Sequence, residues 1–324
     1  MTGPARPPNG AARSPNGAAR PPQRSAVVVN PAKVVDLDAR RAEICGALAE
    51  AGWPEPLWLL TTPEDPGCGM AEQAVADGAE VVFVCGGDGT VMACVAALAG
   101  TDVAVALVPS GTGNLLAANL GVTRDVTAAV ALAVGGDRRR MDIGWVEGVG
   151  DGTRPEGHFT VMAGMGFDAQ LLDDTPEPMK RRFGWPAYVV SALRHLRRRP
   201  MRVRIRLDDA APLRRRARTV LIANVGHLQG GLPLLPQAVL DDGWLDVAVL
   251  TPRTLRHWAS LAWGVLLRRE RVPQMETFRA RRVEVSSDRA QPRELDGDVI
   301  PPARSLVAAV RPEALTLCVP RPAP

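Results

Sequence analysis

The chain has 324 residues, of which 46% are hydrophobic, so it is long and apolar enough for two domains with cores of their own. No apolar run reaches the roughly 18 residues of a membrane-spanning helix, and the first residues lack the apolar stretch of a secretory signal. The five cysteines are scattered, without CxxC pairs or histidines at metal spacing. We therefore expect buried free thiols in a reducing cytosol, and neither a disulfide framework nor a zinc site.

Residues 1–24 contain PNGAAR twice and predict a disordered Pro/Gly/Arg-rich tail. From Ser25 onward, short apolar runs alternate with helical patterns. Strands are expected over 25–29, 57–62, 81–85 and 103–109, and helices over 38–51, 70–77, 90–99, 115–120 and 125–135. This alternation predicts a doubly wound α/β domain with a parallel sheet over residues 25–140.

The stretch VVFVCGGDGT, residues 81–90, predicts a buried strand that stops in glycines and restarts as a helix. Bare backbone N–H groups at the positive end of a helix suit a phosphate. The one charged group there, Asp88, repels phosphate unless a divalent metal or a proton is present. The turn alone therefore indicates a nucleotide with Mg²⁺, or else a plain tight turn between strand and helix.

Polar residues follow the carboxyl ends of four predicted strands, at Asn30, Thr62, Asp88 and Thr112. Ligands of open α/β sheets bind beyond these strand ends. Four such residues favour one shared site over four unrelated turns.

In residues 141–324, strand patterns follow one another with few helical patterns between them. This predicts a β-rich second domain, whose last 15 or so residues could return to the first domain. Strands are expected over 145–149, 158–164, 201–207, 218–225, 244–250, 281–287 and 305–310, and helices only over 182–198 and 255–267. The segment MRVRIRL, residues 201–207, alternates arginine with apolar residues, so one face of that strand should be basic and the other should join the core.

Basic residues are concentrated between Lys180 and Arg218, where 14 of them stand against two aspartates. Such a patch points to an anionic partner, either a membrane surface or a nucleic acid. Residues 180–199, which include Trp185 and Tyr188, are the expected membrane-contacting element. The plainer alternatives are a solvated arginine-rich face and a helix packed on a sheet edge.

Several motifs then occur in a fixed order, and with them the chain resembles the diacylglycerol kinase catalytic-domain family of bacterial lipid kinases. Sphingosine kinases are its relatives, and NAD kinases are more distant ones. The motifs are VVVNP (27–31), GGDGT (86–90), PSGTGN (109–114), GMGFDA (164–169), KRRFGWPAY (180–188), LPQAVLDDGWLDVAVL (235–250) and LDGD (295–298). Neither the P-loop pattern nor GxGxxG occurs, which disfavours those two kinds of nucleotide site.

The resemblance implies that ATP binds in a cleft between the two domains and that its γ-phosphate passes to a lipid hydroxyl. The residues implied for ATP are Asn30, Thr62, Gly86, Gly87, Asp88, Gly89, Thr90, Val91, Met92, Gly111, Thr112 and Asn114. Asp298, with Asp296 orienting it, would accept the hydroxyl proton, and Asp88 could hold water or Mg²⁺. A structural Mg²⁺ would lie at Asp242 and the carbonyl groups of Val239 and Trp244. Without the resemblance, LDGD and DDG read as ordinary turns.

Two positions depart from the family pattern. Met92 and Ala93 stand where an Asn-Glu pair usually follows GGDGT, and Asp298 stands where the final Glu of a DGE motif is usual. The shorter carboxylate would suit a different substrate or weaken catalysis.

The expected function is that of a cytosolic, membrane-peripheral kinase for diacylglycerol or a long-chain base, with a homodimer as a family-based guess. An NAD kinase-like soluble enzyme, a degenerate anion-binding member and a nucleic-acid-binding module are the alternatives. No nucleic-acid partner is expected, because such a module leaves the ordered glycine motifs without a purpose.

Overall fold

The computed structural model describes residues 23–148, 156–166, 200–228, 232–252 and 274–321, together with residues 254, 256, 257, 260 and 264. Contacts within the chain divide it into two units. Unit 1 comprises Met1–Thr112, Leu120–Met141 and Leu315–Pro324, and unit 2 comprises Gly113–Asn119 and Asp142–Ala314. The predicted tail and the helices predicted over 182–198 and 255–267 lie almost wholly outside the described residues.

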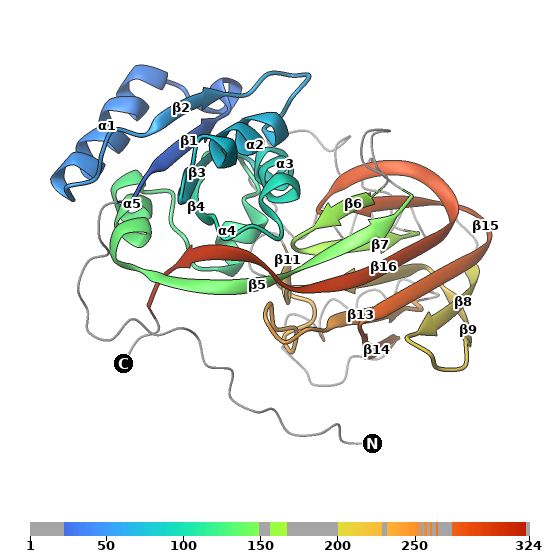
Figure 1. The fold of residues 1–324 in the computed structure, drawn as a ribbon. Helices are drawn as coiled ribbons and strands as arrows, with labels where there is room; N and C mark the ends of the chain where they lie inside the picture. Colours follow the sequence, from blue (N-terminus) through green and yellow to red (C-terminus); the bar gives the residue numbers. More distant parts are fainter. Residues whose placement is uncertain are drawn as a thin grey trace. The chain divides into compact units, whose positions relative to one another are not determined.

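Unit 1 is built on a parallel sheet in the order β2-β1-β3-β4 (Figure 1). Its strands are β1 (Ser25–Val29), β2 (Leu57–Leu60), β3 (Val81–Gly86) and β4 (Ala104–Pro109). The end of the last strand, β16 (Asp298–Val319), adds to β4 in parallel through Thr316 and Leu317. Except in the edge strand β2, almost every residue of β1 to β4 is buried, as expected where helices cover both faces.

Helices cover both faces of this sheet, so the predicted doubly wound α/β fold is confirmed. On one face, α1 (Leu37–Glu50) and α5 (Val126–Gly135) enclose one core cluster with the alternate residues of β1, β3 and β4. On the other face lie α2 (Cys68–Ala76) and α3 (Asp88–Leu98), which contact each other (Figure 1). Asp36 and Asp125 cap α1 and α5 by accepting backbone N–H groups, which explains where these helices begin.

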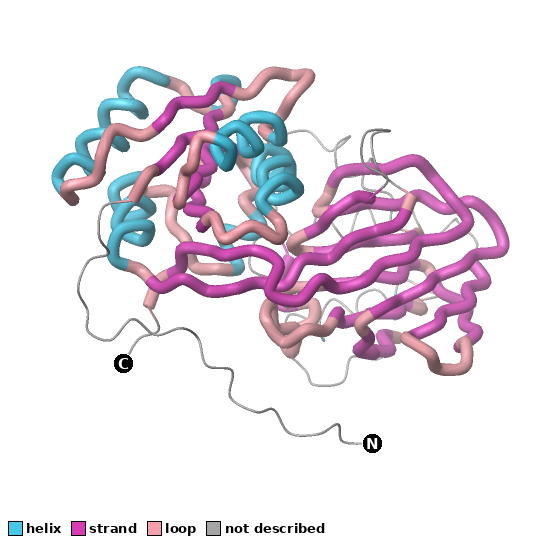
Figure 2. The backbone as a smooth tube through the Cα atoms, viewed as in Figure 1, coloured by secondary structure: helices cyan, strands magenta, loops and turns pink. Residues whose placement is uncertain are grey.

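The described residues of unit 2 lie mostly in strands, whereas α1, α2, α3 and α5 belong to unit 1 (Figure 2). Its strands are β5 (Asp137–Glu147), β6 (Glu156–Phe159), β7 (Met162–Met165), β8 (Met201–Leu207), β9 (Leu213–Ala217), β10 (Thr219–Ala223), β11 (His227–Leu228), β12 (Leu232–Pro233), β13 (Leu245–Leu250), β14 (Met275–Ala280), β15 (Arg282–Leu295) and the main part of β16. Unit 2 also holds the short helix α4 (Leu115–Asn119).

The long strand β15 belongs to two layers of unit 2. Residues 283–287 of β15 pair with β8, whereas residues 293–295 pair with β7. One layer therefore has the order β14-β13-β10-β7-β15, and the other contains β9, β8, β15, β16, β5 and β6. One hydrophobic cluster draws residues from both layers, so the predicted β-rich, sandwich-like second domain is confirmed.

Three details differ from the expected strands. The strand expected from residue 145 begins at Asp137, so β5, like β16, runs through both units. The strand expected over 158–164 bends at Thr160 and Val161 and is divided into β6 and β7. The sequence reading also missed β9, because three consecutive arginines hide its alternation, and β14.

The alternation predicted for MRVRIRL is confirmed. Met201, Val203 and Ile205 lie in the sandwich core, and Arg202 and Arg204 between them are exposed. Within the described residues, no helix has the length and apolar character needed to cross a bilayer.

Candidate functional site

The glycine-rich turn after β3 leaves the start of α3 open. The strand ends at Gly86, Gly87 is the N-cap residue, and Asp88 begins the helix. Because Gly87 has no side chain, the N-cap residue does not cap the first backbone N–H groups of α3. Gly86 itself has no room for a side chain, because an added Cβ would lie 2.6 Å from the Cβ of Thr90. The turn therefore presents backbone donors, which a phosphate could accept from.

A second glycine loop, which follows β4, lies directly against this turn. A Cβ added at Gly87 would stand 3.4 Å from the Cα of Gly111. Arg124 holds this second loop, because its Nη2 donates to the carbonyl oxygens of Gly111 at 3.0 Å and Thr112 at 3.2 Å. The two loops thus approach each other closely, backbone against backbone, with glycine on both sides.

Residues at the ends of β1 and β2 complete this edge of the sheet. The Nδ2 of Asn30 donates to the Oγ1 of Thr90 at 3.2 Å, and its Oδ1 accepts from the backbone N–H of Ala32. The Oγ1 of Thr62 accepts from the backbone N–H of Asp65. Asn30 therefore contacts Thr90, Gly87 lies against Gly111, and Thr62 follows the strand next to β1.

Three other residues implied for ATP lie in α3 or directly before α4. Val91 and Met92 lie half-buried in the first turns of α3. Asn114 is buried, has a φ of 48° and directly precedes α4, in the segment that belongs to unit 2.

The LDGD segment of unit 2 forms a tight hairpin between β15 and β16. Leu295 pairs with Asp298, which leaves two residues in the turn. These two, Asp296 and Gly297, have φ values of 49° and 97°. Positive φ at both central residues is the type I′ geometry, for which Asp-Gly is a favoured sequence. Asp298 is exposed at the start of β16.

The carboxylate of Asp296 is buried and accepts four hydrogen bonds. Its Oδ2 accepts from the backbone N–H and the Oγ1 of Thr160, at 2.7 and 2.8 Å. Its Oδ1 accepts from the N–H groups of Val161 and Met162, at 2.9 and 2.8 Å. Burial raises the pKa of Asp296 to about 6, while these donors act in the opposite direction. Its oxygens are already engaged, so Asp296 is suited to fixing the turn that carries Asp298.

A further buried carboxyl, Glu294, lies two residues before this turn. It stands opposite Gly164 in β7, where an added Cβ would lie 2.7 Å from the Oε1 of Glu294. Its neighbours along the same row of the sheet are Leu221 and Ala248. Burial and then the negative charge of Asp296 raise the pKa of Glu294 to about 7. Glu294 is therefore poised to exchange a proton near neutral pH.

The DDG segment, with Asp242 at its centre, is held by backbone and side-chain contacts of unit 2. The Oδ1 of Asp242 accepts from the N–H of Trp244, and its Oδ2 forms an ion pair with Arg279. Asp142 anchors the same segment, because its carboxylate accepts from the N–H groups of Gly243 at 2.6 Å and Glu313 at 2.8 Å.

Comparison with known proteins shows to which family the chain belongs. The diacylglycerol kinase catalytic domain matches residues 24–146, and the YegS C-terminal NAD kinase beta sandwich-like domain matches residues 161–319. A diacylglycerol kinase of Mycobacterium tuberculosis is 32% identical over 76% of this chain and 79% of its own length. The chain belongs to the diacylglycerol kinase catalytic-domain family.

Other members of this lipid kinase family show a similar likeness. A Chromohalobacter salexigens protein named "Probable lipid kinase YegS-like" is 31% identical over 86% of this chain and 88% of its own length. The fold matches a crystal structure of a diacylglycerol kinase from Bacillus anthracis, with a TM-score of 0.73, 21% identity and coverage of 92% of this chain and 97% of that one. A yeast NADH kinase has the same fold more distantly, with a TM-score of 0.52, 11% identity and coverage of 93% and 84%.

The family implies a Mg²⁺ ion, and Asp242 as arranged here does not fit one. Arg279 occupies the Oδ2 of Asp242, and the described residues contain no group of three or more His, Cys, Asp or Glu side chains that could hold a metal. The metal ligands assigned to Val239, Asp242 and Trp244 therefore stay a prediction. Asp88, the other acid for which a Mg²⁺ contact is predicted, begins α3 in unit 1.

Sequence reasoning missed three residues that shape these sites: Arg124, Asp142 and Glu294. Arg124 gives no sequence signal, since it is one arginine in a loop. Asp142 and Glu294 are acids inside strands with inward-facing neighbours, and a charge at an inward position is the signal that could have found them.

Replacing Gly86 with alanine should lower the free energy of unfolding by about 1–3 kcal/mol, because the new methyl group meets Thr90 inside a packed turn. Chemical denaturation followed by circular dichroism measures this. Gly89 offers a matched control in the same motif, since a Cβ there meets nothing within 4 Å. Gly89→Ala should leave stability unchanged or raise it by up to about 1 kcal/mol. Equal losses in both variants would contradict the role given to Gly86.

Glu294 should make the protein less stable as the pH rises from about 4.5 to about 7. The folded protein holds its proton up to a pKa of about 7, whereas the unfolded chain releases it near the ordinary value of 4.5. The unfolded state therefore gains relative stability across this window. Glu294→Gln should remove this dependence and be more stable than the wild type at pH 8 by on the order of 3 kcal/mol.

Denaturation at pH 5 and pH 8 tests this expectation. Glu284→Gln is the control, since its side chain is 39% exposed and ion-paired, and it should change stability by less than about 1 kcal/mol. A Glu294→Gln variant with the same pH dependence as the wild type would show that Glu294 does not titrate in this way.

Proposed function

We propose that this lipid kinase family member is an ATP- and Mg²⁺-dependent enzyme that phosphorylates a hydroxyl of diacylglycerol or of a related lipid such as a long-chain base. The observation that carries the proposal is the pair of glycine loops at the carboxyl edge of the unit 1 sheet. There Gly87, the N-cap residue of α3, brings no side chain to the positive end of the helix, where backbone N–H groups could donate to phosphate oxygens, and the loop of Gly111 lies against it.

Each residue has a role in this proposal. Asn30 and Arg124 fix the loops, and the N–H groups of residues 87–89 bind phosphate oxygens. Mg²⁺ bound with ATP would balance the phosphate charge, and Asp88 would stand beside it. Asp298 would accept the proton of the lipid hydroxyl as its oxygen bonds to the γ-phosphorus and the bond to ADP breaks. Asp296 positions Asp298 through the rigid type I′ turn.

Transfer from [γ-³²P]ATP to mixed micelles that contain diacylglycerol, monoacylglycerol, sphingosine or ceramide tests the proposal directly. A labelled lipid that requires both the protein and Mg²⁺ supports it, and the labelled product names the acceptor. NAD serves as a soluble acceptor in the same series. Labelled NADP without any labelled lipid would favour an NAD kinase-like activity, and no label on any acceptor would favour a degenerate member.

The proposed enzyme would work on the inner face of the membrane, where its lipid substrate lies. The expected membrane element at residues 180–199 lies outside the described residues. Of the expected basic patch, Lys180–Arg218, the structure describes residues 200–218.

A further inference from the structure

Two neighbouring strands of unit 2 carry arginine at every outward position. These positions are residues 202, 204 and 206 of β8 and residues 214 and 216 of β9. Arg202 pairs with Arg216, and Arg204 pairs with Arg214, so the guanidinium groups project side by side from the same surface. We call the exposed residues Arg202, Arg204, Arg214 and Arg216 the arginine face.

The arginine face lacks the negative charges that would normally balance it. In the described part of the chain, no carboxylate lies within ion-pair distance of these four guanidinium groups. Asp288 contacts the backbone of this face and not its guanidinium groups, because its Oδ1 accepts the backbone N–H of Arg202 at 3.3 Å. On the other side, Arg204 stands next to Ser286 of β15. Like charges directly opposite each other on paired strands are destabilising, so this arrangement has a cost in the isolated protein.

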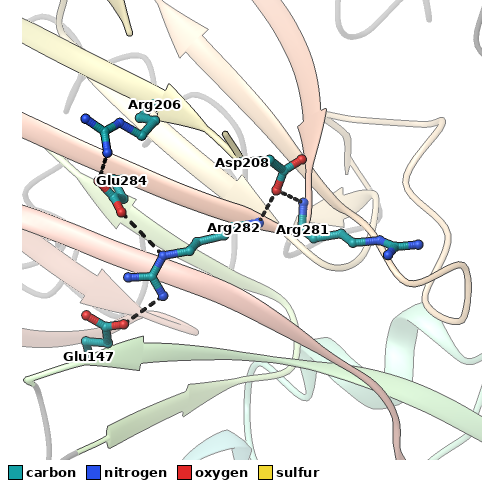
Figure 3. Close-up of polar contacts among 6 residues, drawn as sticks. All are labelled: Glu147, Arg206, Asp208, Arg281, Arg282 and Glu284. Carbon is teal, nitrogen blue, oxygen red and sulfur yellow. Dashed lines mark hydrogen bonds and ion pairs between the residues drawn. The ribbon is translucent and has the colours of Figure 1, made fainter. Parts of the chain in front are cut away.

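Two other arginines of the same layer are paired with carboxylates, as Figure 3 shows. Arg206 pairs with Glu284 at 3.8 Å, and Arg282 pairs with Glu284 at 3.3 Å and with Glu147 at 2.8 Å. These four residues form a ladder of alternating charge across β8, β15 and β5. Within β8, Arg206 is therefore paired with a carboxylate, whereas Arg202 and Arg204 are paired with none among the described residues.

The same contrast occurs within one strand. Arg215 lies between Arg214 and Arg216, but it faces the other way and both oxygens of Glu276 accept from its Nε, at 2.9 and 3.0 Å. A general excess of arginine in the sequence does not explain why Arg215 is paired while, as far as the structure describes the chain, the two outward arginines beside it in β9 are not.

We propose that the arginine face docks the protein on an anionic phospholipid leaflet. Guanidinium groups bind phosphate oxygens with paired N–H donors, and each basic residue at such a surface adds to the attraction. The inference rests on the proposed function, because a lipid acceptor lies in a bilayer. The outward positions of β8 and β9 carry no aromatic side chain on which the bases of a single-stranded nucleic acid could stack. They also carry no apolar one, so the contact is electrostatic and does not insert into the acyl region.

Sedimentation with vesicles of phosphatidylcholine, with and without 30% phosphatidylglycerol, tests the docking surface. The test variant is Arg204→Gln/Arg214→Gln, and the control is Arg206→Gln/Arg282→Gln, which removes the same charge from the ladder. The test variant should bind the anionic vesicles about 25- to 30-fold more weakly, since each arginine contributes roughly fivefold. The control should lose less than about threefold, and neither should bind pure phosphatidylcholine. Thermal melts establish that both variants are folded.

Several outcomes would overturn the proposal. They are equal losses in the test and control variants, binding that does not weaken as salt is added, and tighter binding to duplex DNA or single-stranded RNA through the same arginines. Activity on dioctanoylglycerol, which needs no bilayer, separates this proposal from the function. A test variant that is active on dioctanoylglycerol and fails only on vesicles supports both. A wild type that binds vesicles and phosphorylates no lipid contradicts the function alone.

Discussion

Replacing Asp296 with alanine is expected to lower the free energy of unfolding by about 4 kcal/mol or more. The change leaves four buried donors, from Thr160, Val161 and Met162, without an acceptor, and each such group costs about 1–3 kcal/mol. Asp296→Asn should cost less, because its amide oxygen still accepts while its NH₂ group faces donors. Urea denaturation followed by circular dichroism measures both losses.

Asp208 provides the control for this experiment. It also has a positive φ, of 49°, and its Oδ1 accepts from the backbone N–H groups of Arg281 and Arg282, at 2.9 and 2.8 Å (Figure 3). Water can reach this site, because Arg281 beside it is exposed. Asp208→Ala should therefore cost only about 1 kcal/mol. If Asp296→Ala were as mild as Asp208→Ala, the network around Asp296 would not hold the turn.

Replacing Asp298 with asparagine should reduce kcat for lipid phosphorylation by about 10²- to 10⁴-fold, the range that a general base contributes. The lost group is the proton acceptor in the proposed reaction, and asparagine keeps the shape of the turn. KM for ATP should stay within about threefold, because ATP is bound by the glycine loops in the proposal. Initial rates with varied ATP and lipid concentrations give both constants.

Asp298→Glu is the informative companion, because it restores the carboxylate length that is usual in the family. It should keep or raise kcat, since a longer side chain can still accept the proton. Glu313→Gln, another exposed acid of β16, should leave kcat unchanged. An Asp298→Asn variant with nearly full activity would exclude Asp298 as the proton acceptor, and Glu294 would be the next carboxyl of this hairpin to test.

The sequence was sufficient for those parts of the fold that depend on local pattern. Strand–helix alternation predicted the unit 1 sheet, because each buried run is bounded by glycines and capping residues such as Asp36 and Asp125. The glycines of the two loops were predicted from the sequence because they follow directly on predicted strands. The two glycines at which the loops approach each other, Gly87 and Gly111, can be read directly from the sequence.

What could not be predicted depends on pairing between distant segments. Nothing local in RELDGD shows that Asp296 accepts N–H groups from residues 160–162, or that Glu294 lies over Gly164. The arginine face is a similar case. MRVRIRL predicts one basic strand, but only the register with β9 places Arg202 beside Arg216 and Arg204 beside Arg214.

The strand that completes the unit 1 sheet also sets the order in which the protein can form. Thr316 and Leu317 pair with Ala104 and Val105, more than 200 residues earlier in the chain. During synthesis from the N-terminus, β4 therefore emerges long before its outer neighbour exists. Until the ribosome has translated residue 317, the edge of β4 has open hydrogen-bonding groups, the kind of surface on which other strands can add and which chaperones shield.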